Sequence, residues 1–84
     1  RKDLDKLDNS FLKLIKKRTI LVNQVIKNKK FKKDIVDKQR IAIIMKNISI
    51  KSKKMGIDTL ITQKIWFSMI RAYIDYEFRN FNKK

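Results

Sequence analysis

Basic side chains occupy several positions of this sequence where a helix is expected to carry apolar ones. When the first segment is placed on a heptad repeat, positions 1, 8, 15, 22, 29 and 4, 11, 18, 25 form the two rows of an apolar seam. Arg1, Arg18 and Lys29 interrupt these rows. A guanidinium or ammonium group is costly to bury unless an anion pairs with it. The spacing therefore predicts that these cations bind anions.

Arg18 lies in the middle of the seam, and acidic residues that could pair with it are scarce. Glu77 or Asp37 could provide the counter-charge, or the side chain could extend to water. Glu77 is the only Glu in the chain and follows Ile70 by seven residues, which places it on the apolar face of the last helical segment. A carboxyl group there either pairs with a cation or is kept neutral by desolvation and acts as an acid. The sequence leaves both interpretations open.

Arg40 begins the apolar face of the middle helical segment and is followed by Ile41. An arginine at the start of a helix is ordinary when it stands alone. The basic residues on apolar faces nevertheless outnumber the carboxylates that could be buried with them: Arg1, Arg18, Lys29 and Arg40. If these side chains converge, they need an external anion, most simply a small dicarboxylate, because the arginine fork binds carboxylates bidentately.

Three helices are predicted to position these residues. Pro is absent and Gly occurs once, so the chain contains few residues that end a helix. Apolar residues recur every three or four positions in three segments, which is typical of amphipathic helices. The predicted helices span about residues 1–29, 37–54 and 58–80. We expect Asp37 and Asp58 to cap the second and third helices, and Gly56 to adopt the left-handed conformation that ends the second.

The first predicted helix is too long for a globule of this size. It would extend roughly 40 Å, whereas a monomer of this length is expected to have a radius of gyration of about 12 Å. Its apolar stripe must be covered by another chain or left exposed. We therefore predict an all-α fold, a single domain over residues 1–84 with one long and two shorter helices, assembled into an intertwined homodimer.

The composition excludes several kinds of active site. The chain has no Cys and no His, so thiol nucleophiles, His-based catalytic triads, disulfides and the usual zinc sites are excluded. We expect neither a metal nor a cofactor. No apolar run reaches the roughly 18 residues that span a bilayer, and we expect a cytoplasmic protein without a membrane partner.

The net charge is +15, from 23 basic and 8 acidic residues. Such a charge fits nucleic-acid binding or an anionic small substrate, but it also fits the Lys, Ile and Asn bias of AT-rich coding. The lysines within residues 27–33 and 51–54 could contact phosphates. Most aromatic residues lie instead on the apolar stripe of the last segment, and no nucleic-acid-binding motif is present. A basic helical nucleic-acid-binding module is therefore the disfavoured alternative.

The opening stretch, RKDLDKLDNSFLKLIKKR, resembles the first helix of the AroQ-type chorismate mutases. The resemblance continues without large gaps to about Phe81. Lys29 stands eleven residues after Arg18, residues 36–40 (VDKQR) are similar to a family motif that leads into the second helix, and residues 56–58 match the turn before the third. The apolar parts of the match are generic, whereas four basic residues at the family spacing make it specific.

The resemblance implies the family's fold and chemistry. The fold is an intertwined dimer of three-helix chains, and the reaction is the Claisen rearrangement of chorismate to prephenate, without a metal, a cofactor or a covalent catalyst. The residues implied to hold the two carboxylates of chorismate are Arg18, Lys29 and Arg40 of one chain and Arg1 of the other. Lys29 is also implied to donate to the ether oxygen as the C–O bond breaks. Glu77 takes the place of a second donor, which a Glu can be only when protonated.

Two positions depart from the mutase pattern. Ile41 stands where the mutases commonly have a Glu that contacts the substrate hydroxyl, and Tyr73 replaces a polar residue of the third helix. Both features are similar to the isochorismate pyruvate lyase branch, which makes salicylate and pyruvate, whereas Asp37 favours the mutases. The resemblance implies that Asp37, Ile41 and Tyr73 line the substrate site. Mutase activity is the preferred prediction, lyase activity is the alternative, and a partner-binding domain without catalysis is a third.

Overall fold

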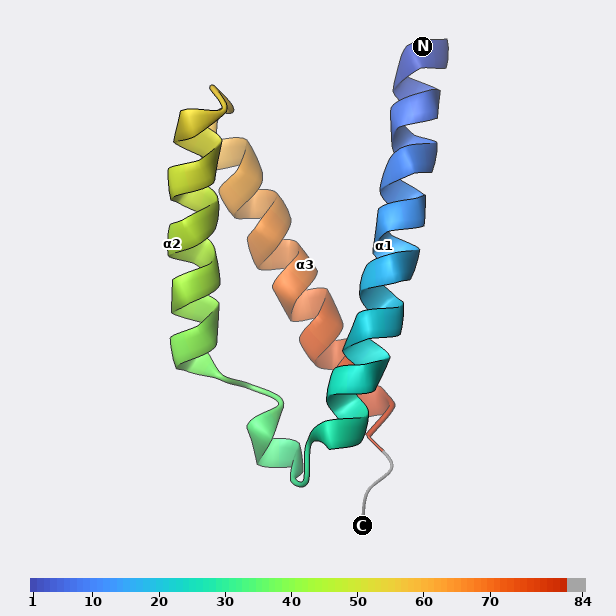
Figure 1. Ribbon diagram of the computed structural model, residues 1–84, viewed down its shortest axis with the longest axis vertical. Coiled ribbons are helices and arrows are strands. Elements are labelled where there is room, and N and C mark those ends of the chain that lie inside the picture. The colour runs from blue at the N-terminus through green and yellow to red at the C-terminus, as the bar shows by residue number, and fades with distance from the viewer. Residues whose placement is uncertain (82–84) are drawn as a thin grey trace.

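The computed structural model describes residues 1–81 of the chain. Its elements are α1 (Lys2–Asn28), the short 3-10 helix η1 (Lys32–Asp34), α2 (Lys38–Lys54) and α3 (Thr59–Arg79) (Figure 1). No strand occurs in this part of the chain, so the prediction of an all-α fold with one long and two shorter helices is confirmed. None of the helices described combines the length and the apolar character that a bilayer-spanning helix needs.

The helix ends follow from the residues predicted to form them. The Asp37 side chain accepts a hydrogen bond of 3.0 Å from the backbone N–H of Arg40, and the Asp58 side chain accepts one of 2.9 Å from that of Leu60. These bonds satisfy backbone donors that have no partner within the first turn of a helix. Gly56 has a φ of 71°, as expected of the residue that ends α2. Both predicted caps and the glycine turn are confirmed.

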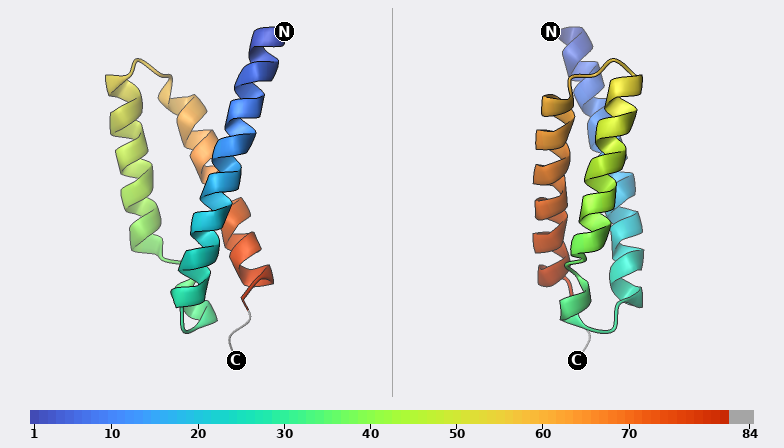
Figure 2. Two further views of the ribbon diagram at one scale, coloured as in Figure 1. Left: turned by 45° about the vertical axis from the view of Figure 1, so that its right-hand side comes forward. Right: turned by 90° about the vertical axis from the view of Figure 1, so that its left-hand side faces the viewer.

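The α2 and α3 helices form an antiparallel hairpin, and α1 runs in the same direction as α3 but inclined to it, so that the two approach towards their C-terminal ends (Figures 1 and 2). Hydroxyl groups hold the hairpin together, since the Ser52 and Thr62 side-chain oxygens lie 2.7 Å apart and the amide of Gln63 donates to Ser49 over 3.0 Å. The predicted inner face of α2 is half-buried throughout: Ile41, Ile44, Met45 and Ile48. The α3 helix is therefore the central element, because it packs against both of the others.

The apolar stripe on the first half of α1 is uncovered within one chain. Ile26 is the only buried residue of α1, whereas Phe11 is 55% exposed. The same stripe exposes four further side chains: Leu4, Leu7, Leu14 and Ile15. The radius of gyration is 14.9 Å, larger than the approximately 12 Å of a compact chain of this length. As predicted, α1 is too long to be covered by the other two helices of its own chain.

Periodicity in the last segment predicts a buried stripe that includes Ile61, Ile65 and Phe78, but these side chains are exposed in a single chain. The buried residues of α3 are Glu77, which was expected on this face, and Thr62, which was not. Thr62 is buried where its hydroxyl meets that of Ser52 on α2, a polar contact that apolar periodicity does not record. The loop predicted between the first two helices contains one helical turn, η1, closed by a 3.0 Å bond from the Ile35 N–H to the Lys32 carbonyl.

Candidate active site

A cluster of hydroxyl groups fixes α1 against α3. The Tyr73 hydroxyl lies 2.8 Å from the Thr19 hydroxyl and donates to the Ile15 carbonyl over 3.1 Å. One turn further along, the Tyr76 hydroxyl donates to the Asn23 side chain over 2.9 Å. The two tyrosine rings meet edge to face, with centroids 6.3 Å apart. These bonds join α1 to α3 beside the basic side chains of α1.

Arg18 lies over the ring of Tyr73, with its guanidinium carbon 5.9 Å from the ring centroid. The expectation that Arg18 is buried in the seam was wrong for a single chain, because this side chain is exposed. The reason is that Arg18 lies at the edge of the contact between α1 and α3, where it reaches the ring of Tyr73 but stays open to solvent, whereas Thr19 lies within that contact. Neither Glu77 nor Asp37 pairs with Arg18, since the aromatic face takes the place of a counter-ion.

Glu77 pairs with Lys29. The Lys29 Nζ atom lies 3.2 Å from Glu77 Oε1 and 3.5 Å from the Ile35 carbonyl oxygen. The two side chains are only 22% and 11% exposed. Of the two interpretations that the sequence left open for Glu77, the single chain therefore adopts the ion pair. The same contact ties the end of α1 to the loop that leads into α2.

Arg18 and Lys29 reach neighbouring turns of α3. Their partners on that helix, Tyr73 and Glu77, are four residues apart, so they lie on one face with about 5–6 Å between their Cβ atoms. Arg18 and Lys29 therefore contact the same face of α3 on consecutive turns, although eleven residues separate them in the sequence. An anion can bind Arg18 without displacing a carboxylate, whereas an anion that binds Lys29 competes with the carboxylate of Glu77.

The residues at the start of α2 follow the loop that Lys29 contacts at Ile35. Asp37 and Arg40 are exposed, and Ile41 is half-buried. Within residues 1–81, no hydrogen bond or ion pair joins their side chains to Arg18 or Lys29. Lys29 does contact the carbonyl of Ile35, which precedes the capping residue Asp37 by two positions. The Asp37 carboxylate is already used as that cap. Arg40 is the remaining cation that could turn towards an anion held by Arg18 and Lys29.

Arg1 lies at the opposite end of the molecule. It precedes α1 as an exposed residue, and the 27 residues of that helix span about 40 Å. Figure 1 shows the N-terminus at the far end of α1 from its contact with the end of α3. An arginine side chain cannot bridge such a distance. Arg1 can therefore join a site that contains Lys29 only if that site belongs to another chain.

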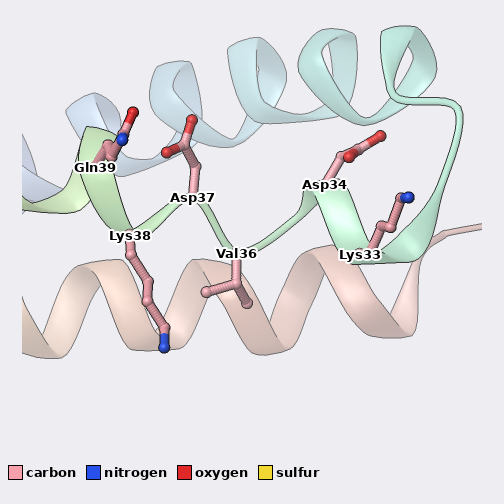
Figure 3. A pocket seen from close by; sticks show the side chains of 6 residues that line it. All are labelled: Lys33, Asp34, Val36, Asp37, Lys38 and Gln39. Carbon is pink, nitrogen blue, oxygen red and sulfur yellow. The ribbon is translucent and has the colours of Figure 1, made fainter.

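The hollow in front of α2 is a poor place for an anion. It has a volume of about 290 Å³ and is lined by Lys33, Asp34, Val36, Asp37, Lys38 and Gln39 (Figure 3). Of the predicted site residues it contains only Asp37. In Figure 3 the Asp34 and Asp37 carboxylates extend from the loop on the side opposite to Val36. The two lysines and two carboxylates of the hollow balance in charge, so it carries no excess of positive charge for a dicarboxylate, and we place the candidate site at the contact of α1 with α3 instead.

Three residues of the α1–α3 contact were missed by the sequence analysis: Thr19, Asn23 and Tyr76. A signal for them exists in the sequence. Thr19 and Asn23 are four residues apart on α1, and Tyr73 and Tyr76 are three apart on α3. Such spacings place each pair on one helix face, so two polar pairs on two helices mark a possible interhelix contact.

The chain was also compared with known proteins. The family model described as chorismate mutase type II matches residues 1–78, which include every residue of the candidate site. No curated protein and no solved structure matches the chain. The family match covers most of the chain and confirms the resemblance that the basic residues carry. The chain therefore belongs to the chorismate mutase type II family.

Proposed function

We propose that the protein is a chorismate mutase that binds the dicarboxylate at the α1–α3 contact. The observation that carries the proposal is that Arg18 and Lys29 both contact one face of α3, at Tyr73 and Glu77, within a chain of this family. Arg18 binds one carboxylate with its fork, and Arg40 from the start of α2 approaches the same anion. The enzyme acts by holding the reactive conformer of the substrate rather than by forming a covalent bond to it.

Lys29 is the catalytic donor in this proposal. During the rearrangement one C–O bond breaks while one C–C bond forms within the same molecule, and negative charge develops on the ether oxygen. The ammonium group of Lys29 stabilises that charge because it is held by Ile35 and Glu77 in a largely water-excluded place. Glu77 assists as a second donor when its carboxyl group is protonated.

The active unit in this proposal is a homodimer. The exposed apolar stripe of α1, which includes Leu7 and Phe11, is covered by a second copy of the chain. Arg1 of that second copy then completes the site that contains Arg18 and Lys29. The support is twofold: the stripe is apolar over half the length of α1, and Arg1 cannot reach the site of its own chain.

Replacing Phe11 with Asp is expected to give a monomer and to lower kcat/KM for chorismate by about a hundredfold, because an unpaired carboxylate opposes burial of the stripe. The matched control is Asn9→Asp, which introduces the same residue on the opposite face of α1. Sedimentation equilibrium and a prephenate assay measure the two effects. A well-folded wild-type monomer at micromolar concentration, or a fully active Phe11→Asp monomer, contradicts the dimer.

Replacing Glu77 with Gln is expected to raise kcat/KM about tenfold at neutral pH, because an amide can always donate to the ether oxygen whereas a carboxylate cannot. Steady-state measurement of prephenate formation by the wild type and the variant checks this prediction. An unchanged kcat/KM in Glu77→Gln removes Glu77 from the mechanism.

The second candidate reaction is the elimination of pyruvate from isochorismate, which leaves salicylate. The observation that favours it is Ile41, which offers a half-buried apolar side chain after Arg40, where the mutases commonly carry a Glu. An assay of the purified protein on each substrate separates the two reactions. Prephenate from chorismate supports the mutase, salicylate from isochorismate supports the lyase, and turnover of neither contradicts both.

A further inference from the structure

The only proton of the Tyr73 hydroxyl is already committed within the chain. Three oxygen atoms form a closed triangle: Tyr73 Oη to Thr19 Oγ1 is 2.8 Å, Tyr73 Oη to the Ile15 carbonyl is 3.1 Å, and Thr19 Oγ1 to that carbonyl is 2.9 Å. In this arrangement the Tyr73 and Thr19 hydroxyls each donate their single proton to the Ile15 carbonyl, which only accepts. Tyr73 would have to give up its hydrogen bond to Ile15 before it could donate to a substrate carboxylate.

The part of Tyr73 that faces the candidate site is its ring. The Arg18 guanidinium lies over that ring, 5.9 Å from the centroid. A cation–π contact attracts the charge of the guanidinium to the face of the ring and uses none of its N–H groups as hydrogen-bond donors. The contact can therefore hold Arg18 while its donors remain available to bind a carboxylate.

The ring and the hydroxyl of Tyr73 act on the same turn of α1. Ile15 precedes Arg18 by three residues and Thr19 follows it directly, so the hydroxyl binds the backbone segment that carries Arg18 while the ring supports its side chain. We propose that Tyr73 is a positioning residue, which holds Arg18 in the orientation that binds a substrate carboxylate and does not itself touch the substrate. The proposal rests on the proposed function and assigns Tyr73 a role other than direct substrate contact.

Tyr76 provides a matched control. It also joins α3 to α1 through its hydroxyl, with a 2.9 Å bond to Asn23, and it is half-buried like Tyr73. The two rings have different neighbours. Arg18 lies over the ring of Tyr73, whereas the ring of Tyr76 packs against that of Tyr73 at an interplanar angle of 79°. If Tyr73 serves only to join the helices, the two tyrosines should be equally important. If it positions Arg18, only Tyr73 should affect anion binding.

The first test needs no substrate. Side-chain NMR signals of Arg18 are measured in the wild type and in Tyr73→Leu, Tyr73→Phe and Tyr76→Leu. We expect an upfield ring-current shift of the Arg18 side-chain protons that is lost in Tyr73→Leu and retained in Tyr73→Phe and Tyr76→Leu. The same Arg18 shifts in Tyr73→Leu as in the wild type overturn the proposal. Because no turnover is involved, this result is independent of the proposed function.

The second test is kinetic. Tyr73→Leu is expected to raise KM for chorismate about tenfold and to change kcat less than about threefold, because a disordered Arg18 must be ordered each time a substrate binds. Tyr73→Phe should rescue most of this loss, and Tyr76→Leu should leave KM unchanged. Equal effects of Tyr73→Leu and Tyr76→Leu on KM overturn the positioning role. Wild-type protein without turnover overturns the proposed function instead, and the NMR result then decides alone whether Tyr73 holds Arg18.

Discussion

Arg18→Ala is expected to lower kcat/KM for chorismate about a thousandfold, which corresponds to about 4 kcal/mol of transition-state stabilisation. Arg18 offers a full guanidinium fork at the candidate site, since its contact in the free chain is the face of Tyr73 rather than a carboxylate. Removing it leaves one carboxylate of the substrate without its charged partner, and truncations of this kind have large effects. Steady-state measurement of prephenate formation checks the prediction.

The same substitution should hardly affect folding. Arg18 is exposed and loses only a cation–π contact, so we expect the free energy of unfolding to fall by less than about 1 kcal/mol. Arg71→Ala is the matched control. Arg71 makes a similar cation–π contact, with its guanidinium carbon 6.0 Å from the ring centroid of Phe67, but both residues belong to α3 and lie outside the site. Urea denaturation should give similar stabilities for both variants, and only Arg18→Ala should lose activity. Comparable activity losses in both contradict the assignment of Arg18.

Lys29→Ala is expected to reduce both activity and stability. Activity should fall about a thousandfold, because the donor to the ether oxygen is removed. Stability should fall by about 2 kcal/mol, because Glu77, only 11% exposed, loses the cation that pairs with it. Steady-state kinetics and urea denaturation measure the two effects separately.

A double variant separates the two roles of Lys29. In Lys29→Ala/Glu77→Gln the unpaired carboxylate is replaced by a neutral amide, so most of the lost stability should return while activity stays low. If the double variant regains activity together with stability, Lys29 supports the fold and is not the catalytic donor. If neither returns, the ion pair is not the cause of the stability loss.

The fold was predictable because local rules determine each helix. The side chains of Asp37 and Asp58 bind the first turns of α2 and α3, and Gly56 takes the left-handed conformation between them. These are contacts between near neighbours in the sequence, so residue type and spacing are sufficient to predict them. The inner face of α2 followed from periodicity for the same reason.

The candidate site was only partly predictable, because it depends on how the helices meet. Periodicity placed Arg18 on a buried seam, whereas the register set by Thr19 and Tyr73 leaves it on the surface of one chain. The partner of Glu77 was also open, and the answer, Lys29, depends on where α1 ends beside α3. Side-chain contacts between helices depend on three-dimensional register, which apolar spacing within a single helix does not determine.

The most direct test of the proposed site is a crystal structure of the protein with a bicyclic dicarboxylate that mimics the transition state of the rearrangement. We expect one ligand at each α1–α3 contact of a dimer, with one carboxylate on the fork of Arg18, the ether oxygen on Lys29, and Arg1 of the second copy closing the site. A ligand bound instead among the lysines of residues 27–33, or bound by a monomer without Arg18, contradicts the proposed site.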